Sequence, residues 1–118
     1  MKHNRSCSRS IKVAAEIKRV VSEYLIRGGV ESYEEINPLM IVVTGVDVSS
    51  CLQHAKVFIS SIDGKPGDNY VNFLEARSSQ IRKAIGDNVK LKFVPEIRFI
   101  IDTSFERARR IEEILKGL

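Results

Sequence analysis

Residues 70–85 read YVNFLEARSSQIRKAI, and this stretch decides the fold. Its apolar side chains recur at helical spacing on either side of a wholly polar step, Arg77-Ser78-Ser79-Gln80. A continuous amphipathic helix would place an apolar residue within this step, and serine hydroxyls there can hydrogen-bond to their own backbone and bend or break a helix. The stretch therefore predicts two helices joined by a kink, with the second helix ending near Gly86-Asp87.

Strands are predicted on both sides of the helix pair. Residues 39–48 are mostly β-branched and apolar, which is typical of a buried strand, with a bulge or a close backbone approach at Gly45. Residues 54–62 alternate, and the connector before them is too short for a crossover, so we expect an antiparallel hairpin. A third strand over residues 89–101 should lie at an edge or be bulged at Pro95, which cannot donate a ladder hydrogen bond. Its apolar face would carry Leu91, Phe93, Ile97, Phe99 and Ile101.

A helix is predicted near each end of the chain. Residues 10–27 gather their apolar side chains within one arc, and Gly28-Gly29 supplies the C-cap. A Thr-x-x-Glu capping box at Thr103 opens a last helix. The inward side of that helix would carry Phe105, Ala108, Ile111 and Leu115. The order of elements predicts an α+β fold, in which helices pack on one face of a three-stranded sheet. We expect residues 1–9 to form a flexible basic arm and residues 10–118 to form a single domain.

Composition bounds the class of protein. The 118 residues are 43% hydrophobic and 29% charged, which is typical of one globular domain. No run approaches the ~18 apolar residues of a membrane span. The N-terminal residues lack the apolar core of a secretory signal, and their basicity leaves an organellar transit peptide open. Only Cys7 and Cys51 are present, so neither a disulfide framework nor a zinc cluster is indicated. We expect a cytoplasmic monomer without a membrane partner.

Charge is distributed unevenly along the chain. Residues 1–27 carry seven basic and two acidic residues, residues 28–75 carry two and seven, and residues 76–118 carry ten and six. Basic ends around an acidic middle indicate a face for a polyanion, the alternative being a merely basic protein. No enzyme, metal or cofactor is predicted, because His3 and His54 belong to no metal-ligand spacing and no phosphate-binding glycine-rich loop is present.

The motifs and their order resemble bacterial ribosome-binding factor A, a KH-like family of the type II topology. Six segments carry the resemblance: KVAAEI (12–17), NP (37–38), VTGVDVS (43–49), AKVFIS (55–60), IR (81–82) and LKFVPEI (91–97). The resemblance implies the order αββααβ, here with an added C-terminal helix, and an RNA-binding domain. It also implies a non-catalytic factor that binds the 30S subunit and its 16S rRNA late in maturation, assists processing of the 5′ end and matters most in the cold.

The sequence departs from the family pattern in two places. The family has an Ala-x-Gly kink between the paired helices, where an ungapped match puts Arg77 and Ser79; a one-residue shift would instead give Ala76 the alanine role. Ser50-Cys51 occupies the hairpin connector, where an Arg-Asp pair is common, so a polar cap made by that aspartate has no counterpart here. Two other functions stay open: a KH-like module for single-stranded RNA or DNA unrelated to ribosome assembly, and a protein adaptor that uses the acidic middle segment.

Three groups of residues are candidates for RNA contact, and for each the alternative is a solvated basic surface. Hydroxyls, helix-start amides and cations at the kink can hold phosphates; these residues are Arg77, Ser78, Ser79, Arg82 and Lys83. Cations opposite the apolar faces of the predicted strands could share one exposed surface; these are Lys56, Lys90, Lys92 and Arg98. A basic arm could order on binding rRNA; it would use Arg5, Arg9 and Lys12.

Three further features each have a structural and a functional interpretation. Phe58, next to these cations, could stack a base, but such a phenylalanine more often packs under a helix. Residues 64–67 form a literal Gly-x-x-Gly, but their place between a strand and a helix favours a turn. Cys51 and His54 could serve as nucleophile and base, but their spacing at a strand entry turns them to different faces and favours an inert thiol.

Overall fold

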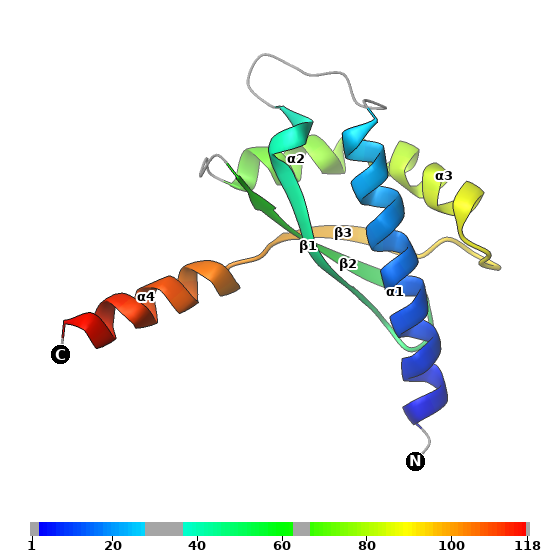
Figure 1. Cartoon of the computed structure of the whole chain (residues 1–118). Helices are drawn as coiled ribbons and strands as arrows, with labels where there is room; N and C mark the ends of the chain where they lie inside the picture. Colours follow the sequence, from blue (N-terminus) through cyan, green and yellow to red (C-terminus); the bar gives the residue numbers. More distant parts are fainter. Residues whose placement is uncertain (1–2, 28–36, 63–66, 118) are drawn as a thin grey trace.

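The secondary structure of the computed structural model follows the predicted order (Figure 1). The structure describes residues 3–27, 37–62 and 67–117. Within these ranges its elements are α1 (His3–Ile26), η1 (Pro38–Met40, one turn of 3-10 helix), β1 (Ile41–Val48), β2 (His54–Ser61), α2 (Gly67–Glu75), α3 (Ser78–Asn88), β3 (Glu96–Ile101) and α4 (Ser104–Lys116). The predicted α+β fold is confirmed. In the described part of the chain, no helix has the length and apolar character needed to cross a bilayer.

The three strands form one sheet with β2 in the middle. β1 and β2 pair antiparallel, which confirms the predicted hairpin. The register shifts between Val43 and Gly45, so Thr44 is the extra residue of a bulge beside the predicted glycine. β3 runs parallel to β2 and has no other strand beside it in the described part of the chain, so it is an edge strand, one of the two positions that Pro95 indicated.

The core lies between one face of the sheet and the helices α1, α2 and α3. Alternate side chains of the strands are buried there, including Val57 and Ile59 from β2. The helices contribute side chains that are also fully inaccessible, namely Ile17, Val21, Leu74, Ile81 and Ile85. Full burial of one such side chain stabilises the fold by roughly 1.5–3 kcal/mol. The helices are therefore held in place by their apolar stripes.

α1 begins earlier than predicted. The sequence placed its first residue at Ser10, whereas the helix starts at His3, so the backbone of residues 3–9, assigned to a basic arm, is helical. Residues 3–9 contain neither glycine nor proline, so no helix-breaking residue prevents the helix from extending to the N-terminal side of Ser10. Ser10, the predicted first residue of the helix, is buried.

α4 does not pack as predicted. Ile111 and Leu115, expected to face inward, are 56% and 62% exposed, and the helix extends away from the sheet (Figure 1). The helix-bearing face of the sheet is already occupied by α1, α2 and α3, so that face leaves no room for α4. The side chains of Phe105 and Ala108 lie outside the described residues. Thr103 is the N-cap residue of α4, as predicted, but its side chain makes no cap hydrogen bond, and the side chain of Glu106 lies outside the described residues.

The third strand is shorter than predicted. β3 begins at Glu96, and residues 89–95 form a loop. The physical reason is the partner strand: His54, the first residue of β2, pairs with Glu96, so earlier residues have no strand beside them. Phe93, predicted on the buried face, is 76% exposed.

Candidate nucleic-acid interface

The predicted kink is a break between α2 and α3 at Ala76-Arg77. The backbone N–H of Arg77 donates to the carbonyl of Leu74 three residues earlier (3.0 Å), which tightens the last turn of α2. Arg77 then has a non-helical ψ of 13° and is the N-cap residue of α3. The two predicted helices are confirmed, and the break begins one residue before the polar step that signalled it.

The first turn of α3 begins with Ser78 and Ser79, which are half-buried and exposed, respectively. No side-chain cap engages it, and it contains no acidic residue. Among the described residues, no acceptor is bonded to the backbone N–H of Ser78 or Ser79. Unpaired amides at the positive end of a helix dipole form a ready anion site. Lys83, one turn further along α3, is exposed.

The two arginines of the predicted kink group already have protein partners. Arg77 Nη1 donates to the carbonyl of Phe73 (3.1 Å), and its guanidinium lies 3.9 Å from the centroid of the Phe73 ring. Arg82 donates from Nε to the carbonyl of Pro95 (3.3 Å) and from Nη2 to that of Val94 (3.1 Å). Arg77 therefore braces the end of α2, and Arg82 ties the loop of residues 89–95 to α3. A guanidinium has five N–H donors, so Arg82 retains donors for a phosphate beside these two bonds.

The structure separates the four cations that were expected to share one sheet surface. Lys56 and Arg98 are register partners on the face of the sheet without helices, which we call the open face. Lys90 and Lys92 are not there, because residues 89–95 are a loop rather than part of β3. Asp47 is the register partner of Lys56 on its other side, and Arg98 Nη2 lies 3.9 Å from a Glu96 carboxylate oxygen.

Phe58 is half-buried on the open face, in register with Gly45 and Ile100. Its side chain points to the same face as its β2 neighbour Lys56, because alternate strand residues share a face. The more frequent role, packing under a helix, is therefore not the one that the structure shows.

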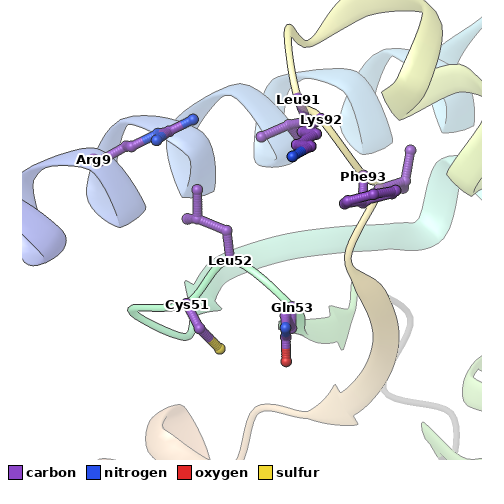
Figure 2. Close-up of a pocket in the computed structure, with 8 residues that line it drawn as sticks. Arg9, Cys51, Leu52, Gln53, Leu91, Lys92 and Phe93 are labelled. Carbon is purple, nitrogen blue, oxygen red and sulfur yellow. The ribbon is translucent and has the colours of Figure 1, made fainter.

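A pocket of about 390 Å³ opens where α1, the β1–β2 connector and the loop of residues 89–95 meet (Figure 2). Its lining residues are Arg9, Cys51, Leu52, Gln53, Leu91, Lys92, Phe93 and Val94. The sequence had selected Arg9 and Lys92 as candidates but placed them in two different groups. It missed Phe93, whose position among alternating apolar residues suggested a strand. Pro95, which cannot donate a ladder hydrogen bond and directly precedes β3, was the available signal that the strand begins later.

Two residues of the predicted N-terminal group can be placed on α1. Arg9 lines the pocket, and Lys12 is exposed one turn later on the helix. The side chain of Arg5 lies outside the described residues, as do residues 64–66 of the Gly-x-x-Gly match.

Cys51 and His54 do not form a nucleophile and base. Cys51 Sγ lies 3.3 Å from Ser49 Oγ, while His54 Nδ1 lies 3.7 Å from Glu96 Oε2. The hydrogen bond with Ser49, followed by one with the Gln53 backbone, lowers the pKa of the exposed Cys51 thiol. Within the described ranges, no group of three His, Cys, Asp or Glu residues is arranged to hold a metal ion.

Comparisons with known proteins agree over most of the chain. A family model described as ribosome-binding factor A matches residues 9–115. The ribosome-binding factor A of Zymomonas mobilis is 32% identical over 109 residues, which cover 92% of this chain and 77% of that relative. The ribosome-binding factor A of Halothermothrix orenii is 38% identical over 111 residues, covering 92% of this chain and 86% of the relative.

A solved structure shares the fold. The crystal structure of ribosome-binding factor A from Thermus thermophilus matches with a TM-score of 0.65 at 14% identity, over 78% of this chain and 94% of that chain. A homology model of the Thermus thermophilus factor, fitted into the cryo-EM map of a 30S complex, matches with a TM-score of 0.59 at 17% identity, over 76% of this chain and 91% of that one. With the fold shared and the family model spanning most of its length, this chain belongs to the ribosome-binding factor A family.

Proposed function

We propose that this protein binds the 30S ribosomal subunit through 16S rRNA, late in subunit maturation, and assists processing of the 5′ end without catalysis. The single observation that carries the proposal is the break between α2 and α3, where two unpaired amides at the start of a helix lie among cations. Membership in the family supports it, as does the relative fitted into a 30S complex.

The groups around the break suit a phosphate backbone. The amides of Ser78 and Ser79 lie at the positive end of α3, and Lys83 adds an exposed cation one turn away. Arg82 keeps donors for a phosphate while its other donors hold the carbonyls of Val94 and Pro95, and Arg77 adds a positive charge at the break while it bonds the Phe73 carbonyl. This arrangement supplies charge and geometry but no group that would cleave a bond, so any effect on processing would follow from binding.

Binding of purified 30S particles at increasing salt tests the proposal. Affinity should fall steeply with salt, because cations that meet phosphates release counterions. Lys83→Glu should weaken binding and lower the slope of log affinity against log salt by about one or more. The matched control is Lys18→Glu, the same charge change at an exposed position of α1, on the side of that helix opposite to Arg9. This variant should bind like the wild type.

Three results would contradict the proposal. The first is a wild-type protein that does not co-sediment with 30S particles at low salt. The second is a Lys18→Glu variant that loses as much affinity as Lys83→Glu, since only diffuse charge would then matter. Binding of isolated RNA with equal affinity, whatever its source, and without preference for 30S particles would favour a general KH-like module instead.

A further inference from the structure

The pocket beside the loop of residues 89–95 has no role in the interface at the helix break. We propose that it binds one unpaired nucleotide of RNA, with the base stacked on Phe93 and the phosphate held by Arg9 and Lys92. This inference rests on the proposed function and adds a second contact with its own chemistry. In Figure 2, the Arg9 side chain extends from α1 toward the loop that carries Lys92 and Phe93, and Leu52 extends from the connector toward α1.

Phe93 is an exposed ring on an anchored backbone. The flanking residues Leu91 and Val94 pack against the core, so the loop turns these side chains inward and Phe93 outward. Pro95 is fully buried, and the carbonyls of Val94 and Pro95 are both held by Arg82. A ring that is 76% exposed on a loop fixed at neighbouring positions is suited to act as a stacking platform.

Cations and an apolar wall complete the site. Lys92 Nζ lies 5.8 Å from the centroid of the Phe93 ring, and Arg9 reaches the same pocket from α1. Neither cation forms an ion pair with a carboxylate among the described residues. Leu52 contributes an aliphatic wall and has a φ of 60°, a left-handed conformation that is unusual for leucine.

The combination favours a nucleotide over a segment of protein. A nucleotide joins a flat ring, which stacks on an aromatic face, to a phosphate, which attracts cations. An acidic peptide would satisfy Arg9 and Lys92 but would leave the Phe93 ring without a stacking partner. The volume of about 390 Å³ falls within the roughly 300–1,000 Å³ of small-molecule sites.

Because the chain contains no tryptophan, Phe93→Trp provides a single fluorescent reporter. This variant should be quenched when titrated with a short oligouridylate. It should not be quenched by an abasic ribose-phosphate oligomer of the same length, which carries the same phosphates without bases. Phe93→Ala should weaken oligouridylate binding roughly 5- to 150-fold, which corresponds to about 1–3 kcal/mol for one stacked base. Ile62→Ala, at another exposed apolar position, is the matched control and should leave binding unchanged.

The outcomes separate this site from the proposed function. Equal affinity of wild type for the two oligomers, or unchanged binding by Phe93→Ala, would overturn the nucleotide site even if the protein binds 30S particles. A Phe93→Ala variant that binds oligouridylate normally but 30S particles weakly would also overturn it, because a protein segment would then occupy the pocket. Phe93-dependent binding of oligouridylate without binding of 30S particles would support the site and contradict the proposed function.

Discussion

Arg82→Lys separates the charge of residue 82 from its hydrogen-bonding geometry. In the structure, Nε and Nη2 of Arg82 donate to two adjacent carbonyls, those of Pro95 and Val94. Lysine keeps the positive charge but carries one compact ammonium, which cannot reproduce the planar pair of donors. We therefore expect the variant to retain its long-range attraction for RNA while loosening the loop of residues 89–95.

The size of the effect follows from these two bonds. Two hydrogen bonds from a charged donor would contribute roughly 3–6 kcal/mol if both were shielded from solvent. Arg82 is exposed, so water competes for its donors, and lysine can recover one of the two bonds. We expect the free energy of unfolding to fall by about 1–2 kcal/mol.

Urea unfolding followed by circular dichroism measures this loss, and amide hydrogen exchange shows where it arises. Exchange should accelerate in residues 89–95 and remain unchanged in the core strand β2. Arg110→Lys, the same substitution at an exposed position on α4, is the control and should have wild-type stability. Unchanged stability together with unchanged exchange in the loop would refute the anchoring role, and Arg82 would then be only a surface cation.

Three further substitutions test other parts of the structure. Ile81→Ala, at a fully buried position on α3, should lower the free energy of unfolding by about 2–5 kcal/mol in urea titrations. Asp102 Oδ1 accepts a hydrogen bond from the backbone N–H of Ser104 (2.9 Å), so Asp102→Ala should destabilise the start of α4 by about 0.5–2 kcal/mol. Thr103→Ala should have a smaller effect, because the Thr103 side chain makes no cap bond. Hydrogen exchange of the α4 amides measures both effects. Burial raises the pKa of Tyr24, and the charge of Arg77 opposes this shift more weakly. The folded state therefore keeps the Tyr24 proton to higher pH than the unfolded state does, so wild-type stability should fall as pH rises from about 10 through the folded-state pKa. Tyr24→Phe should lack this decline when unfolding is measured across that pH range.

Local patterns predicted the helix break because its signal is local. The polar residues of 77–80 interrupt a helical apolar stripe, and the break at Ala76-Arg77 begins one residue before them. The limits of β3 and the packing of α4 depend on other elements instead. Leu91 and Phe93 alternate as strand residues do, but β2 offers them no partner before His54. The amphipathic pattern of α4 likewise does not reveal that three other helices already cover the sheet.

The candidate site was predicted in part for the same reason. The sequence shows which residues are cations, but it does not show which of them are hydrogen-bonded to the protein and which line a pocket. Arg82 is separated by more than ten residues from the carbonyls it binds, and Phe93 became a candidate only when its exposure was known. The basic residues of α1 and of the loop, assigned to separate groups by sequence position, line one pocket.

The fold brings together charged residues that are far apart in the sequence. The two basic ends of the chain meet because α1 packs beside α3, where the Tyr24 hydroxyl donates to Gln80 Oε1 (2.5 Å). On the open face of the sheet, Asp47 and Glu96 lie beside the cations Lys56 and Arg98, so the two signs are mixed. The side formed by α1, α3 and the loop of residues 89–95 instead carries the cations of both the pocket and the helix break. A polyanion approaching this protein should therefore be directed to that side rather than to the open face.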